Sequence, residues 1–246
     1  MMVTTATIRP VTAVKSPSAP PSRHALSLAG VDLPGAAPPV VRVEPAREVV
    51  VVLPRSRVAG REVHLDRCLA DGVPVVVRPS GGGAVVLSPG VVAASVVAAV
   101  DPAPQFPEPY FRAFGTATAM ALAACGAPGL VVRGVSDLCF DDRKVAGSAL
   151  RLWRGRVLYQ LSVLVDPDLA LFERYLPLPS RAPDYRRGRA HADFVTTLRA
   201  TGCRAGVGEV AAALSGALAE VVERLRAGAA RVYSRRGSSP WEPSDE

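Results

Sequence analysis

The stretch Arg78-Pro79-Ser80-Gly81-Gly82-Gly83-Ala84-Val85 lies between two apolar runs that are typical of β-strands, Val75–Val77 and Ala84–Leu87. Three glycines directly after a strand are costly in backbone entropy, and they suit a main chain that approaches a ligand with free N–H groups. The spacing fits neither a P-loop nor a dinucleotide fingerprint, because no Gly-Lys-Ser/Thr follows and no third glycine opens a helix. A plain turn between two strands is equally compatible with it, so the rest of the chain must decide.

The chain of 246 residues is long enough for one large domain with short tails. Residues 1–38 are rich in Pro, Ser, Ala and Gly, which predicts a disordered N-terminal tail with at most a short element around residues 24–29. Residues 39–230 carry the apolar runs of a folded domain, and residues 231–246 are a polar C-terminal tail. No apolar run approaches the roughly 20 residues of a membrane-spanning helix, so we expect no membrane association.

The net charge of +7 comes almost wholly from arginine, because only Lys15 and Lys144 among the 29 basic residues are lysines. Lys15 lies in the predicted tail, so Lys144 is the single lysine of the predicted folded domain. In a chain that otherwise uses arginine, a retained lysine indicates a compact point charge that must reach an oxygen in a confined site. The arginines form no basic helix, so we expect a phosphate-bearing ligand or an acidic protein partner and no nucleic acid.

The cysteines and histidines give no sign of a metal site. The chain has three histidines and four widely spaced cysteines without a CxxC pair: Cys68, Cys125, Cys139 and Cys203. Unpaired cysteines, together with an N-terminus that lacks the apolar run of a signal peptide, predict a reducing, cytoplasmic location.

Short β-type runs occur mostly in pairs, with a few helices between them. The expected strands are 40–43, 49–53, 75–78, 84–87, 91–100, 130–133, 137–140, 144–150 and 157–165, and the expected helices are 61–70, 110–125, 169–175 and 207–227. Strands 137–140 and 144–150 form a predicted hairpin, and 157–165 is expected to pair with it across residues 153–156. The Pro- and Arg-rich segment 176–189 is expected to be an irregular loop. This order predicts an α+β fold with a mixed, mainly antiparallel sheet flanked by helices.

A second motif occupies the predicted hairpin: Ser136-Asp137-Leu138 is followed by Asp142-Arg143-Lys144-Val145-Ala146-Gly147-Ser148-Ala149. Together with the glycine stretch it resembles the signatures of the lipoate–protein ligase A family, Arg-Arg-x-Ser-Gly-Gly-Gly-Ala-Val and Asn-Asp-Leu with Gly-Arg-Lys-Val-Ala-Gly-Ser-Ala. Several positions depart from the family pattern. Val77 stands for the first arginine, and Tyr159-Gln160-Leu161 stands where the family carries a His-Gly pair.

The resemblance implies that residues 39–230 are a catalytic domain like that of lipoate and biotin ligases, related to class II aminoacyl-tRNA synthetases. It implies that lipoate or octanoate reacts with Mg²⁺-ATP to give an acyl-adenylate, and that a lysine of a lipoyl domain then takes the acyl group. Lipoyl domains of 2-oxoacid dehydrogenase complexes or the glycine cleavage H protein would be the partners. Lys144 is the catalytic candidate, because charge develops on phosphate and carbonyl oxygens during both steps. The residues implied to bind substrate or adenylate are Arg78, Ser80, Gly81, Gly82, Gly83, Ala84, Asp137, Gly147 and Ser148.

Two alternatives remain open at the level of sequence. One is an octanoyltransferase that takes octanoyl from acyl carrier protein, in some relatives through a cysteine thioester. Cys139, five residues before Lys144, is the candidate nucleophile for that route, since a thiolate is the attacking species; a buried structural cysteine is the simpler interpretation. The other alternative is an acyl-binding relative that has lost turnover.

Overall fold

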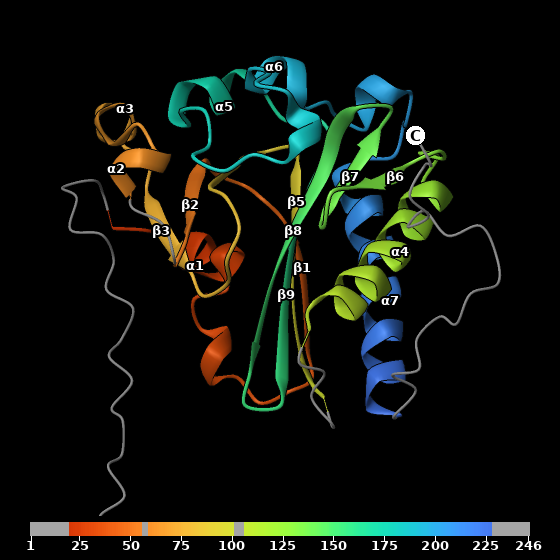
Figure 1. The fold of residues 1–246 in the computed structure, drawn as a ribbon. Coiled ribbons are helices and arrows are strands. Elements are labelled where there is room, and N and C mark those ends of the chain that lie inside the picture. Colours follow the sequence, from red (N-terminus) through yellow and green to blue (C-terminus); the bar gives the residue numbers. More distant parts are fainter. Residues whose placement is uncertain (1–19, 56–58, 101–105, 228–246) are drawn as a thin grey trace, which may run out of the picture.

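The structure is a computed structural model that describes residues 20–55, 59–100 and 106–227. A six-stranded antiparallel sheet stands at its centre, with two long helices on one side and a small second sheet on the other (Figure 1). The large sheet has the order β1-β5-β9-β8-β7-β6. Its strands are β1 Val40–Pro45, β5 Val91–Ala99, β6 Val131–Arg133, β7 Asp137–Phe140, β8 Arg143–Trp153 and β9 Arg156–Leu164. The mixed, mainly antiparallel α+β fold is therefore confirmed.

The two sides of the large sheet belong to two separate cores. Alternate residues of β5, such as Val92 and Val96, pack under α4 (Glu108–Ala124) and α7 (Val207–Arg226). Val91 and Ala93 point the other way, into a core shared with the small sheet. Because β5 is covered on both faces, it is apolar except at Ser95, unlike a strand with one face in water.

The small sheet has the order β3-β2-β4, with β2 (Val50–Pro54) parallel to β3 (Val75–Arg78) and antiparallel to β4 (Val85–Leu87). The glycine stretch joins β3 to β4, and both strands pair with β2 instead of with each other. The interpretation of this stretch as a simple turn between paired strands is therefore wrong. The loop spans the width of a strand, which a tight turn cannot do.

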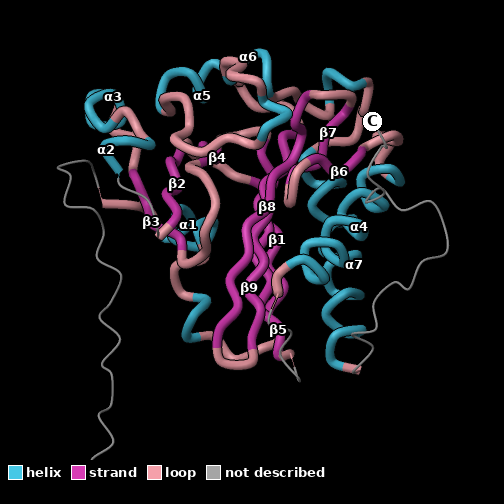
Figure 2. The backbone as a smooth tube through the Cα atoms, in the orientation of Figure 1, coloured by secondary structure: helices cyan, strands magenta, loops and turns pink. Residues whose placement is uncertain are grey.

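The remaining helical elements are short and lie mainly beside the small sheet and at one end of the large one (Figure 2). They are α1 Arg23–Ala29, η1 Leu33–Gly35, α2 Ala59–Glu62, α3 Leu65–Ala70, α5 Ala170–Tyr175, η2 Asp184–Arg186, α6 His191–Phe194 and η3 Arg199–Thr201. The predicted helix over 61–70 is two helices, because the N–H of His64 donates to the Tyr175 carbonyl (2.9 Å) and interrupts the helical hydrogen bonds.

The short element expected around residues 24–29 is present as α1, whereas the rest of the predicted disordered tail is ordered from residue 20 onward. Ser22 caps α1 by accepting a hydrogen bond from the N–H of Ala25, and Gly30 ends the helix in a left-handed conformation. Leu28 and Ala29 are buried against distant parts of the chain, which local composition does not reveal. Residues 1–19, with Lys15, and the predicted tail 231–246 lie outside the described residues.

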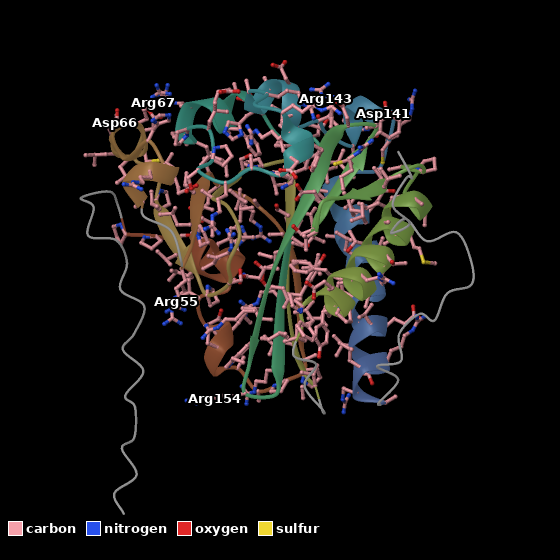
Figure 3. The ribbon with its side chains drawn as sticks, viewed as in Figure 1. Arg55, Asp66, Arg67, Asp141, Arg143 and Arg154 are labelled. Atoms are coloured by element: carbon pink, nitrogen blue, oxygen red, sulfur yellow. The ribbon has the colours of Figure 1, made fainter. Side chains whose placement is uncertain are left out.

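The predicted hairpin and its extension are confirmed. The β7–β8 turn, with Asp141 and Arg143, lies at one end of the large sheet, and Arg154 marks the β8–β9 turn at the other (Figure 3). The Arg143 guanidinium donates to the carbonyls of Ala192 (2.9 Å) and Val195 (2.8 Å). These bonds fasten the hairpin to α6 and to the chain that follows it.

Gly90 ties the small sheet to the large one. It turns the chain from β4 into β5 at φ 92°, and a Cβ built there would lie 2.4 Å from the Asp166 carbonyl oxygen. Gly72 has a similar backbone (φ 65°), but a Cβ there would meet nothing within 4 Å.

We expect Gly90→Ala to lower the free energy of unfolding by about 3 kcal/mol, as the sum of left-handed strain and a clash with rigid backbone. Gly72→Ala should lower it by only about 1 kcal/mol, because it suffers the strain alone. Urea denaturation of both variants measures the difference. Equal decreases in the free energy of unfolding would show that the close approach of Gly90 to the Asp166 carbonyl does not restrict the side chain at position 90.

Candidate active site

A cavity of about 350 Å³ lies between the two sheets. Its apolar wall comes from α1, the small sheet, β5, β9 and α5, and includes Leu28, Val52, Leu87, Ala93, Leu161 and Phe172. Charged and polar side chains also face it: Arg78, Asp137, Lys144, Ser148, Gln160, Arg181, Arg186 and His191. The cavity therefore offers apolar surface and several polar groups to one ligand, as small-molecule sites in proteins do.

Lys144 is held at the cavity wall by an ion pair. Its Nζ lies 2.8 Å from Oδ1 of Asp137, and the two side chains are 27% and 11% exposed. Oδ2 of the same carboxylate accepts a hydrogen bond from the Tyr185 hydroxyl at 2.8 Å. One carboxylate thus orients the ammonium, which has three protons and can also donate to a ligand.

Gly147 provides the space that the Lys144 side chain occupies. A Cβ at Gly147 would lie 2.4 Å from Nζ and 2.5 Å from Cε of Lys144. Gly147 is paired with Asp137 across the β7–β8 ladder, so the lysine crosses over the glycine to reach its carboxylate. Gly147 also lines the cavity, so the absence of a side chain leaves room for the lysine at the cavity wall.

Arg78 is 5% exposed and organises the glycine stretch from within. Its Nε donates to Ser80 Oγ (3.0 Å) and its Nη2 to the carbonyls of Gly81 and Gly83 (2.7 Å for Gly83). Burial lowers the pKa of the guanidinium to about 10, so it stays charged at neutral pH. Arg78 thus stabilises the shape of the loop, and it also lines the cavity.

The sequence predicts that the main-chain N–H groups of Gly81, Gly82 and Gly83 are left without a protein acceptor, so that they can donate to a ligand. None of them donates to an acceptor within the described part of the chain, and Gly82 and Gly83 line the cavity. Ala84, Asp137, Lys144, Gly147 and Ser148 line it as well, whereas Ser80 and Gly81 do not. The two sequence motifs therefore meet at one cavity.

Gln160 links this loop to two other elements, and the sequence showed it only as a departure from a family pattern. Its Oε1 accepts a hydrogen bond from Ser80 Oγ (2.6 Å), and its Nε2 donates to the Ala29 carbonyl (3.0 Å) and to Ser95 Oγ (3.1 Å). A buried amide with all these partners satisfied fixes the glycine loop, β5 and α1 relative to one another.

The sequence did not indicate Tyr185 as a site residue, because it lies in the Pro- and Arg-rich segment 176–189, which has no hydrophobic periodicity. Its ring packs against Phe194 with centroids 5.3 Å apart, and burial is the first cause that raises the pKa of its hydroxyl. The hydroxyl therefore stays protonated and donates to Asp137.

Cys139 is completely buried, and the residues that line the cavity do not include it. Its thiol lies 3.5 Å from the Tyr185 hydroxyl oxygen, and burial raises its pKa. A neutral, enclosed thiol does not have the properties of a nucleophile. The structure therefore favours the simpler interpretation of a buried structural cysteine.

The described part of the chain has neither a cluster of metal ligands nor a membrane-spanning helix. Within residues 20–55, 59–100 and 106–227 no three His, Cys, Asp or Glu side chains are grouped as metal ligands would be. No helix in these ranges combines the length and the apolar character needed to cross a bilayer.

Comparison with known proteins agrees with this geometry. The model of the lipoyl protein ligase A/B catalytic domain family matches residues 33–219. The chain belongs to this family, and the resemblance inferred from the two motifs is confirmed. A lipoate–protein ligase of Streptococcus pyogenes is 34% identical over 104 residues, which cover 42% of this chain and 30% of that protein. The match thus spans about a third of the relative's length.

Solved structures share the fold. One belongs to a bipartite lipoate protein ligase of Thermoplasma acidophilum, described with its E2 lipoyl domain; it has a TM-score of 0.69, 22% identity, and coverage of 86% of this chain and 88% of that one. Another is a lipoate–protein ligase A bound with ATP, with a TM-score of 0.67, 23% identity, and coverage of 84% and 87%. A third, a putative lipoate protein ligase of T. acidophilum with bound lipoic acid, has a TM-score of 0.67, 21% identity, and coverage of 86% and 89%.

The burial of Cys139 predicts slow alkylation. In the folded protein at pH 8, iodoacetamide should modify Cys139 much more slowly than the half-exposed Cys125, because only an exposed thiolate reacts. Peptide mass spectrometry after timed quenching gives both rates. Equal alkylation rates for Cys139 and Cys125 would show that the Cys139 thiolate is accessible, and would support a thioester intermediate at Cys139.

Proposed function

We propose that this protein activates lipoate or octanoate with ATP and transfers the acyl group to a lysine of a lipoyl domain. The observation that carries the proposal is the single oriented ammonium of Lys144, held by Asp137 in a cavity whose remaining wall is largely apolar. An apolar wall suits an acyl chain, and a fixed cation suits the oxygens on which charge develops. The ligases of the same fold that carry ATP or lipoic acid support the two small substrates.

In the first step a carboxylate oxygen of the acyl substrate bonds to the α-phosphorus of ATP, and the bond from that phosphorus to the pyrophosphate oxygen breaks. Lys144 donates to an α-phosphate oxygen as charge builds there, and Asp137 holds it in place. The N–H groups of Gly82 and Gly83 are suited to donate to the adenylate. ATP enters with Mg²⁺ as a substrate complex.

In the second step the acceptor lysine's amine attacks the acyl carbonyl carbon, loses a proton, and AMP leaves with the carbonyl–oxygen bond electrons. The same ammonium stabilises the oxyanion of this step. The acceptor is a lipoyl domain, in line with the E2 lipoyl domain described with the Thermoplasma ligase. The lipoyl domains of 2-oxoacid dehydrogenase complexes and the glycine cleavage H protein both offer a lysine amine, so both are proposed acceptors.

The test is the mass of a lipoyl domain after incubation with the protein. We expect the domain to gain the mass of the acyl group with lipoate or octanoate and Mg²⁺-ATP, and no mass without ATP. A gain from octanoyl-acyl carrier protein without ATP would identify the transferase alternative instead. No gain under either condition would support the non-catalytic alternative.

The same assay tests Lys144. Lys144→Arg should lower the transfer rate by about 100-fold or more, because a wide guanidinium cannot take the place of a point charge beside Asp137. Arg154→Lys, at the far end of the β8–β9 hairpin, is the matched control and should keep the full rate. A Lys144→Arg variant that transfers normally would remove Lys144 from its proposed role.

Gly147→Ala tests the path of the lysine. The new methyl group would overlap Lys144 Nζ and Cε, so the ammonium must move by roughly 1 Å, which lowers kcat by about 100-fold. Gly208→Ala, in open space on α7, should leave kcat unchanged. Unchanged kcat in a folded Gly147→Ala variant would show that the position of the ammonium is not limiting.

A further inference from the structure

Arg186 faces the same cavity from η2, on a segment that carried no sequence motif. It is 4% exposed, and its Nε donates to the carbonyl of Arg189 at 2.9 Å. Its Nη2 is buried and has no hydrogen-bond partner within the described ranges. A buried donor without an acceptor costs free energy, so this arrangement needs an explanation.

The three buried or half-buried cations of the cavity wall differ in what neutralises them. Lys144 is paired with the Asp137 carboxylate. Arg78 is surrounded by Ser80 Oγ and loop carbonyls. No carboxylate of the described residues lies within 4 Å of the Arg186 guanidinium nitrogens, and its one carbonyl partner binds Nε, which leaves Nη2 without a partner. Among these three side chains, Arg186 is therefore the one with a buried donor that is not satisfied.

An aromatic ring holds Arg186 in position. Its guanidinium lies 4.6 Å from the centroid of Phe194, a contact that attracts the cation without neutralising it. Arg189 lies over the same ring at 5.4 Å, but its charge is paired with Asp142 at 2.8 Å. Arg189 is thus in an ion pair and does not line the cavity, whereas Arg186 lines the cavity and has no ion pair with a described residue.

Arg186 and Lys144 act on the same part of the cavity. Burial is the first cause that lowers the pKa of His191, which also lines the cavity. The positive charges of Arg186 and Lys144 lower that pKa further, whereas the Glu173 carboxylate raises it. Arg186 and Lys144 are therefore both within electrostatic reach of one side chain, and a ligand with negative charge on several phosphate groups can contact both cations.

We infer that Arg186 binds the phosphate chain of the nucleotide, beyond the α-phosphate assigned to Lys144. The inference rests on the proposed function and adds to it a residue that no motif indicated. The planar fork of a guanidinium matches two oxygens of a phosphate, and Nη2 gains the acceptor that it lacks.

The test compares ligand affinities by calorimetry in the full-length protein, for ATP, AMP, adenosine and octanoate. Arg186→Gln should weaken ATP binding by about 10- to 100-fold, the loss expected for one or two hydrogen bonds to a charged group. AMP should lose less, and adenosine and octanoate should bind as before. Arg187→Gln, an exposed neighbour with the same change in net charge, should bind all four ligands like the unmodified protein.

The outcomes separate this inference from the proposed function. Equal ATP affinity in a folded Arg186→Gln variant, or a loss of octanoate binding instead, overturns the phosphate site and leaves the proposed function standing. An unmodified protein that does not bind ATP overturns both. If Arg186→Gln does not fold, Arg186→Lys decides: it keeps the charge but loses the fork, so ATP binding alone should weaken several-fold, and unchanged ATP binding contradicts the site.

Discussion

A buried guanidinium is the constraint on which the glycine loop depends. Arg78 lies inside the loop that it stabilises and turns the carbonyls of Gly81 and Gly83 toward itself. The N–H groups of Gly81, Gly82 and Gly83 then have no acceptor among the described residues, and Gly82 and Gly83 line the cavity. Gln160 then fixes the loop to β5 and α1 through Ser80. The loop thus has one shape because a charge without a carboxylate partner must be satisfied by main-chain oxygens.

The cavity lies between the small sheet and the large sheet, and strand β5 of the large sheet has a core on each face. Its residues pack alternately toward the α4–α7 layer and toward the small sheet, so the space between the sheets is bounded by rigid strands on both sides. Catalytic groups that are placed on strands are held more precisely than groups on loops. Lys144 and Asp137 come from paired strands, whereas Arg186 and Tyr185 come from the loop-like segment after α5. The paired strands thus carry the proposed catalytic ammonium and its carboxylate, and the segment after α5 carries the arginine and the tyrosine around them.

The sequence predicted most of the helices and strands correctly. The strands from Val91 to Leu164 and the long helices α4 and α7 have strong periodicity and lie where expected. The two motifs around Gly82 and Lys144 were expected to form one site, and they line one cavity. The failures fall where local pattern competes with distant partners: α1 is helical because it packs on remote strands, and the helix at 61–70 breaks because His64 bonds to Tyr175.

The sequence by itself determined the fold class and the family, and it identified Lys144 as the single lysine of the predicted folded domain, because these depend on residue type and on spacing along the chain. Only the tertiary structure decided what each charge does. Arg78, Lys144 and Arg186 are all cations at one cavity, and the first is bound by carbonyls, the second by a carboxylate and the third by an aromatic ring. The effect of a charge depends on the groups within a few ångströms of it. The partners of these three cations lie close to them along the chain, but the glycine loop, the β7–β8 ladder and the approach of η2 to α6 bring them into contact, which no local pattern specifies.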